Sequence, residues 1–225
     1  MLPPYLLRHG RAYEAKASWT GRHLRWLDSQ SFPHPAQRLA FQEMLNAVRA
    51  TAERIDRLEA ALVEIVWTMA PVVAAFQAMR GVQFVTAATM VAEAGDLRRF
   101  EPPRQLMAFL GLVPSERSTG ETKRQGGITK TGNASARKAL VEAAWTYRHS
   151  AGLGREHQQR QQGLSQPVRD IAWKAQTRLC ARYRRLSAKG KRNTVMVVAI
   201  ARELAAFLWA IAQHADPQPL RTVNG

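Results

Sequence analysis

Apolar residues recur at alternating spacings of three and four along residues 35–71, which is the pattern of one face of a long helix. Pro35 suits the first turn of this helix. A stripe this narrow over four heptads is typical of a coiled-coil seam, so we expect self-association through residues 41–69. An antiparallel helical hairpin within one chain is the alternative. The stripe consists of Phe41, Met44, Val48, Thr51, Ile55, Leu58, Leu62, Ile65 and Met69.

Helical spacing resumes after Gly81 and stops at Gly95. Two helices joined at a glycine turn have the outline of a helix-hairpin-helix, which offers backbone N–H groups to a nucleic-acid phosphate. Gln83 stands where such a turn usually has a second glycine, so an ordinary helix pair is the alternative. A further helix is expected after residue 133, with Asn133 or Ser135 as its N-cap.

Two more apolar stripes follow, and strand-like alternation is almost absent, so the predicted fold is mainly α. We expect an irregular lead-in with a short helix at 1–35, a long heptad helix at 36–77, a compact helical domain with a glycine-rich loop at 78–214, and a tail at 215–225. The stripes are Val168, Ala172, Ala175, Leu179, Tyr183 and Leu186, then Val195, Ala199, Leu204, Leu208 and Ile211.

The segment between residues 111 and 133 is polar, glycine-rich and basic. It is not a phosphate-binding P-loop, because Thr129 precedes Lys130 where Gly-Lys-Ser/Thr is needed. Glycines allow backbone N–H groups to approach an anion, and a serine there can donate to a phosphate or attack it. The candidate phosphate contacts are Arg117, Gly120, Lys123, Arg124, Gly126, Gly127, Lys130, Arg137 and Lys138.

Positive charge is the strongest compositional signal, with 33 Lys and Arg against 17 Asp and Glu and a formal net charge of +16. Residues 101–192 hold 19 of these cations and 6 of the acids. Such a surface predicts a polyanionic partner and steep salt dependence of binding. Arg178, Arg182 and Arg185 form a basic stripe on one predicted helix, which either follows a phosphate backbone or only solvates the helix.

The cysteine, histidines and hydropathy of the chain bear on metal binding, secretion and membrane insertion. Cys180 is a single cysteine, and the six histidines show no metal-ligand spacing, so we expect no cofactor in this chain. The sequence shows neither a signal-peptide pattern nor a run of 18 apolar residues. We expect a protein of the bacterial cytoplasm, associated with the nucleoid when bound, and no membrane segment.

Four stretches together resemble a known family: "GVQFVTAATMVAEAGDLRRF", "FLGLVPSERSTGETKRQGGITKTGN..ARKALVEAAW", "WKAQTRLCARYRRL" and "AIARELAAFLWAIA". The chain is similar to the C-terminal half of the DEDD-class bacterial insertion-sequence transposases, which are also described as bridge-RNA-guided recombinases. The resemblance implies DNA and a guide RNA as partners. It also implies that the "RSTG" stretch supplies a serine nucleophile, Ser118, with Thr119 as the competing position.

The same resemblance implies a RuvC-like domain whose four acidic residues hold Mg²⁺, and we expect that domain to be missing here. The acids of the long helix, such as Glu53 and Asp56, lie among basic residues and indicate a solvated face. We therefore expect these residues alone to bind nucleic acid without cutting and rejoining it. A non-enzymatic basic nucleic-acid-binding protein, or an inactive transposase remnant, is the alternative function.

Overall fold

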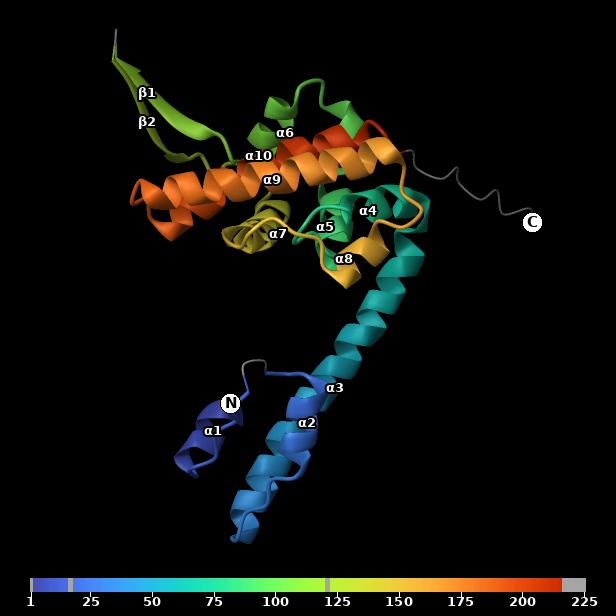
Figure 1. Ribbon diagram of the computed structural model, residues 1–225, viewed down its shortest axis with the longest axis vertical. Helices are drawn as coiled ribbons and strands as arrows, with labels where there is room; N and C mark the ends of the chain where they lie inside the picture. The colour runs from blue at the N-terminus through green and yellow to red at the C-terminus, as the bar shows by residue number, and fades with distance from the viewer. Residues whose placement is uncertain (1, 16–17, 120–121, 216–225) are drawn as a thin grey trace, which may run out of the picture. The chain divides into compact units, whose positions relative to one another are not determined.

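The computed structural model describes residues 2–15, 18–119 and 122–215; for residues 116–119 and 122–125 it describes the backbone but not the side chains. The chain divides into unit 1, Met1–Ala61, and unit 2, Leu62–Gly225. Ten α-helices and a two-stranded sheet make up these described residues, which confirms the mainly α fold (Figure 1).

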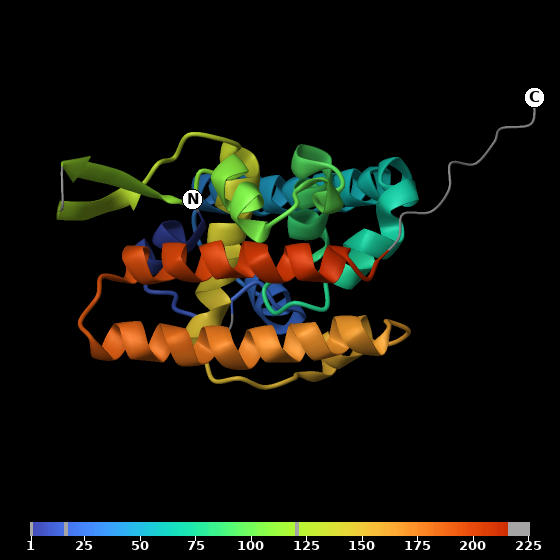
Figure 2. The ribbon, with the colours of Figure 1, turned by 90° about the horizontal axis from the view of Figure 1, so that it is seen from above.

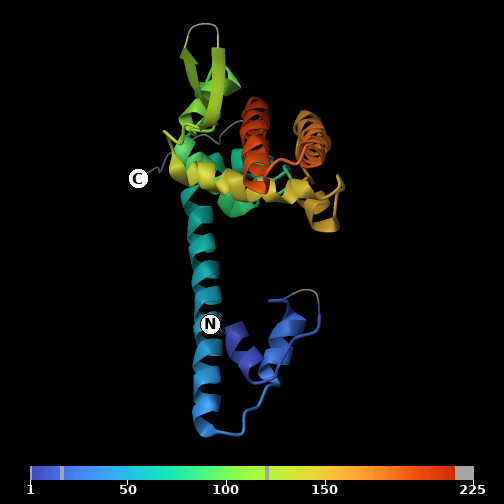
Figure 3. The same cartoon turned by 90° about the vertical axis from the view of Figure 1, so that its left-hand side faces the viewer.

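Unit 1 consists of α1 (Leu2–Arg8), α2 (Gly21–Asp28) and most of α3 (Pro35–Ile65). Its small core is made of leucine and phenylalanine side chains from the three helices and from the connection between α2 and α3, and α1 and α2 lie beside α3 (Figure 3). Tyr5 of α1 donates its hydroxyl to the Gln37 carbonyl at 2.8 Å, and the Thr20 hydroxyl caps α2. The core residues are Leu2, Leu6, Leu27, Phe32, Phe41 and Leu45.

The helix expected over 36–77 is shorter, because α3 ends at Ile65. A short 3-10 helix, η1 (Trp67–Met69), and then α4 (Ala70–Phe76) follow. Pro71 explains the break, since a proline has no N–H and its ring clashes with the carbonyl four residues earlier. The apolar stripe is buried only near the start of α3, and Ile55, Leu58 and Ile65 are at least half exposed.

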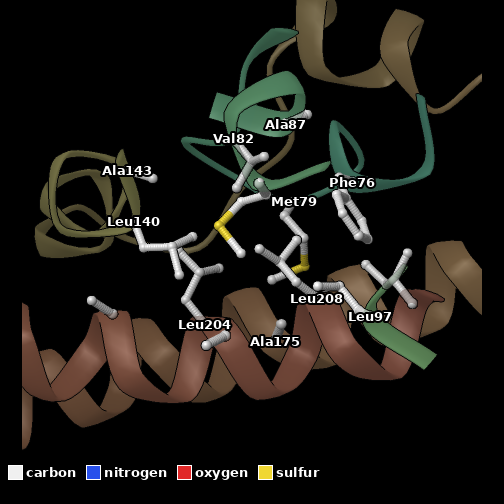
Figure 4. Close-up of a cluster of buried hydrophobic side chains, with 14 of the residues drawn as sticks. Phe76, Met79, Val82, Ala87, Leu97, Leu140, Ala143, Ala175, Leu204 and Leu208 are labelled. Carbon is white, nitrogen blue, oxygen red and sulfur yellow. The ribbon is translucent and has the colours of Figure 1, made fainter. Parts of the chain in front are cut away.

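Unit 2 is built around α10 (Asn193–Ala212), which packs against α9 (Gln166–Ala188), α7 (Ala134–Ala144), α6 (Pro103–Phe109) and α4. Figure 2 shows α9 and α10 side by side, and Figure 4 shows Leu204 and Leu208 of α10 among Met79, Leu97 and Leu140. Length and composition would allow α10 to cross a membrane, but half of its most apolar window is buried in this core. Packing in the core of unit 2 therefore accounts for the apolar character of α10.

The turn at Gly81 joins α4 to α5 (Phe84–Ala94) and is held from two sides. Gly81 has a φ of +79°, and a Cβ there would lie 2.4 Å from the Ala143 carbonyl oxygen of α7. From α8 (Arg155–Arg160), His157 Nε2 contacts the Ala78 carbonyl at 2.6 Å. The glycine is thus required for packing on α7. Whether this helix pair acts as a helix-hairpin-helix stays a prediction.

The glycine-rich segment forms a hairpin, where the sequence predicted a loop. β1 (Pro114–Thr119) and β2 (Thr122–Ile128) pair antiparallel, and the hairpin projects away from the helices of its unit (Figures 1 and 3). The strands could not be predicted from the sequence, because strand prediction relies on an apolar face and residues 115–125 carry no apolar side chain. The register pairs Glu116 with Gln125, Arg117 with Arg124, Ser118 with Lys123 and Thr119 with Thr122.

Candidate nucleic-acid interface

The hairpin carries both nucleophile candidates on β1. Ser118 is paired with Lys123, and Thr119 with Thr122. Consecutive residues of a strand occupy opposite faces, so the two candidates belong to different faces of the hairpin. Arg117 and Arg124 form another cross-strand pair. Gly120, the remaining candidate of this region, lies outside the described residues.

One backbone hydrogen bond closes the base of the hairpin, and another ties the segment that follows it to the end of α6. The Thr129 N–H donates to the Val113 carbonyl at 2.9 Å, and the Asn133 N–H donates to the Phe109 carbonyl at 2.9 Å. Gly132 permits this approach, since it has a φ of +137° and a Cβ there would lie 2.2 Å from the Phe109 oxygen. Asn133 accepts from the Ala136 N–H, which confirms it as the N-cap of α7. The hairpin therefore starts from a defined anchor.

Gly126 and Gly127 lie at a β-bulge near this anchor, opposite Ser115. The Ser115 hydroxyl donates to the Gly127 carbonyl at 3.0 Å, and a Cβ on Gly126 would lie 2.5 Å from that hydroxyl oxygen. A Cβ on Gly127 would meet nothing within 4 Å. Gly126 thus allows the close approach of Ser115 at the bulge. Gly127 is exposed and has room for a side chain.

A groove of about 690 Å³ lies between the base of the hairpin and the first half of α10. Its floor is largely apolar, and its charged residues are Lys130 and Arg202. Val195, which the sequence placed in the apolar stripe of α10, is 54% exposed. The groove residues are Leu112, Pro114, Gly126, Gly127, Ile128, Lys130, Thr194, Val195, Val198, Ala199 and Arg202.

Sequence reasoning missed the contribution of α10 to this groove. Thr194 and Arg202 lie eight residues apart on a helix whose pattern indicated only a core element. The one available signal was Arg202, which together with Glu203 interrupts an apolar run. Lys130, by contrast, was predicted, and the structure places it at the groove with a φ of +57°.

The two candidate cations on α7 have different surroundings. Arg137 is half-buried and donates to the Leu110 carbonyl at 2.9 Å, at the end of α6. It therefore helps to hold the hairpin anchor. Lys138 is exposed, and no ionic partner for it exists among the described residues.

The arginines of α9 lie apart from the hairpin groove and are partly neutralised. Glu203 of α10 accepts a hydrogen bond from Arg178 Nε at 3.0 Å and is also ion-paired with Arg182. Arg185 is exposed and has no such partner among the described residues. No sequence pattern indicates that Glu203 faces these arginines.

Three buried titratable groups lie elsewhere in unit 2. Burial lowers the pKa of His157, and burial raises the pKa of the Cys180 thiol. Burial also raises the pKa of Tyr147, whose hydroxyl has no hydrogen-bond partner among the described residues. Among those same residues, no three His, Cys, Asp or Glu side chains gather to hold a metal ion.

Fold and surface together define a mainly helical protein with a projecting polar hairpin and an excess of basic side chains. Residues 73–160, which include the hairpin, match the Transposase IS116/IS110/IS902 family. This part of the chain is therefore similar to that transposase family. Helices α9 and α10 lie beyond the matched segment.

The chain is also similar to proteins named as transposases. It is 53% identical over 211 residues to the putative transposase y4qE of Sinorhizobium fredii, an alignment that covers 94% of this chain and 51% of that protein. It is 25% identical over 179 residues to the transposase for insertion sequence element IS1533 of Leptospira borgpetersenii, covering 77% and 51%. A segment of 68 residues is 41% identical to the transposase for IS1111A of Coxiella burnetii, covering 30% and 19%. The chain thus spans about half the length of the first two relatives.

Proposed function

We propose that this chain takes part in DNA transposition as part of an insertion-sequence transposase, and that the hairpin with the groove at its base contacts the DNA. The hairpin carries the proposal: strands rich in serine, threonine, lysine and arginine project from a packed domain, inside the segment that matches the transposase family. Lys130 and Arg202 add charge at its base. A guide RNA would be the second polyanionic partner of this chain, in addition to DNA. Two copies of the chain would associate through residues 41–69.

The proposed chemistry is transfer of a DNA phosphodiester to a serine. The Ser118 oxygen attacks the phosphorus, a serine–phosphorus ester forms, and the bond to one bridging strand oxygen breaks. The serine proton passes through solvent to that oxygen, which leaves as a hydroxyl. One ester replaces another, so no outside energy source is needed, and the neighbouring cations stabilise the charge that develops at phosphorus.

The described residues do not fit a magnesium site, since activation by two metal ions needs carboxylates around one point. We therefore propose that acidic residues of a RuvC-like segment, outside these 225 residues, hold Mg²⁺ when the chemistry occurs. These 225 residues alone bind DNA but form no covalent adduct.

DNA binding is tested by titrating a labelled duplex at several salt concentrations. Lys130→Ala should lower the slope of log K against log salt by about 0.9, because one phosphate contact is lost. Arg54→Ala removes an exposed cation from α3 and serves as the control. Equal slopes for the Lys130 and Arg54 variants would refute the groove as a contact.

Catalysis is tested by adding a RuvC-like segment of a related transposase with magnesium, RNA and DNA, and looking for a protein–DNA adduct on a denaturing gel. We expect Ser118→Ala to abolish the adduct and Thr119→Ala to retain it. The alternative function, a non-enzymatic nucleic-acid-binding protein or an inactive remnant, is favoured by the lack of a metal site among the described residues. It predicts DNA binding without an adduct under every condition.

A further inference from the structure

A second hollow, of about 460 Å³, lies on the surface formed by α9 and α10, which run side by side (Figures 1 and 2). It shares no lining residue with the groove at the hairpin. Three guanidinium groups and one carboxylate surround it, and its residues are Arg178, Ala181, Arg182, Arg185 and Glu203. We call this hollow the arginine pocket.

Glu203 organises the arginine pocket. Its side chain is only 14% exposed, and it accepts from Arg178 Nε and from Arg182, which lie one helical turn apart on α9. A carboxylate that engages two arginines at once restrains their long side chains, so less rotamer entropy remains to be lost when a ligand binds. The pocket is therefore built before any ligand arrives.

Several donors in the arginine pocket remain unused. Each guanidinium has five N–H donors, and Glu203 engages only some of those on Arg178 and Arg182. The Nε of Arg182 is buried without a hydrogen-bond partner in the described part of the chain, and Arg185 has no ionic partner there. The exposed N–H groups of Arg178 and Arg185 can therefore donate to an oxyanion that enters the pocket.

The charge and shape of the pocket point to one class of anion. Three arginines and one ionised glutamate give a formal charge of +2, and a phosphate monoester carries a charge of about −1.5 to −2 at pH 7. Arginine pairs with phosphate oxygens through two parallel hydrogen bonds. A monoester presents three terminal oxygens to a concave site, whereas a diester within a strand presents two and is flanked by sugar on both sides.

We propose that the arginine pocket binds the terminal phosphate monoester at the end of a nucleic-acid strand. This inference deepens the proposed contact with nucleic acid and does not depend on the serine chemistry. The pocket would distinguish a strand end from continuous backbone, whereas the hairpin groove would hold the backbone itself.

The test compares two otherwise identical oligonucleotides, one with a 5′-phosphate and one with a 5′-hydroxyl, each labelled at the 3′ end. Their affinities are measured by fluorescence anisotropy at one salt concentration. We expect the phosphorylated strand to bind about tenfold more tightly, in keeping with an added charge-assisted contact. Inorganic phosphate at millimolar concentration should reduce this preference.

Two variants locate the effect. Arg185→Ala should remove the preference and leave the affinity for the hydroxyl strand within about twofold, because surface substitutions of this kind rarely disturb the fold. Arg184→Ala removes a neighbouring exposed arginine that does not line the pocket, and it should preserve the preference. A thermal melt of each variant confirms that it is folded.

The remaining outcomes separate this inference from the proposed function. Equal affinities of the wild-type protein for both strands, or a preference that survives in Arg185→Ala, overturn the pocket inference alone. Equal weakening of both strands in Arg185→Ala shows an ordinary backbone contact and also overturns it. Failure of the protein to bind either strand overturns the proposed nucleic-acid function together with the pocket.

Discussion

Gly132 is the residue on which the position of the hairpin depends most sharply. It lies where the segment after β2 passes the end of α6, and its φ of +137° lies in a region that disfavours side chains. A Cβ at this position would also lie 2.2 Å from the Phe109 carbonyl oxygen, which is backbone and cannot rotate away. Gly132→Ala therefore imposes both backbone strain and a steric clash.

The magnitude follows from these two terms. The unfavourable backbone conformation costs about 1–3 kcal/mol, and forcing an extra methyl group into a packed site costs about 1–3 kcal/mol. Their sum is about 2–6 kcal/mol, a large share of the roughly 5–15 kcal/mol that stabilises a typical domain. With about 2–4 °C of Tm per kcal/mol for a domain of this size, the Tm should fall by at least about 4 °C.

Thermal unfolding followed by circular dichroism measures this effect, and Gly127→Ala is the matched control. Gly127 lies in the same hairpin, its φ is outside the left-handed range, and an added Cβ meets nothing within 4 Å. This variant should melt within about 1–2 °C of wild type, since alanine at a compatible position is nearly neutral. Similar Tm values for Gly132→Ala and Gly127→Ala would refute the role of Gly132 as the anchor.

Three further predictions concern stability and assembly. Tyr147→Phe should raise the Tm by about 2–4 °C, because the buried Tyr147 hydroxyl has no hydrogen-bond partner in the described structure and its removal recovers roughly 1 kcal/mol of desolvation; a fall in Tm would contradict this. Burial lowers the pKa of His157 in the folded protein, so the unfolded chain binds a proton at a higher pH than the folded one. The neutral imidazole therefore contributes stability above about pH 6.5. This stability should be lost as the pH falls towards the folded-state pKa. Urea unfolding at pH 7.5 and 5.5 should show a larger loss for wild type than for His157→Gln, and identical losses would refute it. Leu58→Lys should weaken a dimer formed through α3 by at least about a hundredfold in sedimentation, since each copy loses roughly 1.5–3 kcal/mol of burial. Leu39 is also exposed but lies off the stripe, so Leu39→Lys should leave the dimer intact.

The helical part of the fold could be predicted well from the sequence. The stripe from Val168 to Tyr183 is buried in α9, and Leu204, Leu208 and Ile211 are buried in α10, because core packing imposes the helical period directly on the sequence. Asn133 was predictable as an N-cap from its position before an alanine-rich run. These features depend on local spacing alone.

The hairpin and the two hollows could not be predicted in the same way. The polar strands lack the apolar face on which strand prediction depends, although Thr119 and Thr122 suit strands by propensity. Lys130 and Arg202 both line the groove, and Arg178 is ion-paired with Glu203 in the arginine pocket. Each pair comes from segments that are distant in sequence, so only tertiary packing brings them to one site.

The glycines show the same division between local and tertiary causes. The sequence drew attention to Gly126 and Gly127 because they are adjacent in a basic segment. The structure places the tightest backbone contacts at Gly132 and Gly81, where an added Cβ would lie 2.2 and 2.4 Å from a carbonyl oxygen. A single glycine carries no sequence signal for such a contact, because its neighbour comes from another helix.

The central claim, that a serine of the hairpin engages a DNA phosphate, is tested most directly by mapping a covalent adduct. The adduct formed with magnesium, RNA, DNA and an added RuvC-like segment would be digested with nuclease and protease, and the modified peptide identified by tandem mass spectrometry. The proposal predicts a nucleotide on Ser118 of β1. A nucleotide on Thr119, or on any residue outside the hairpin, would contradict it.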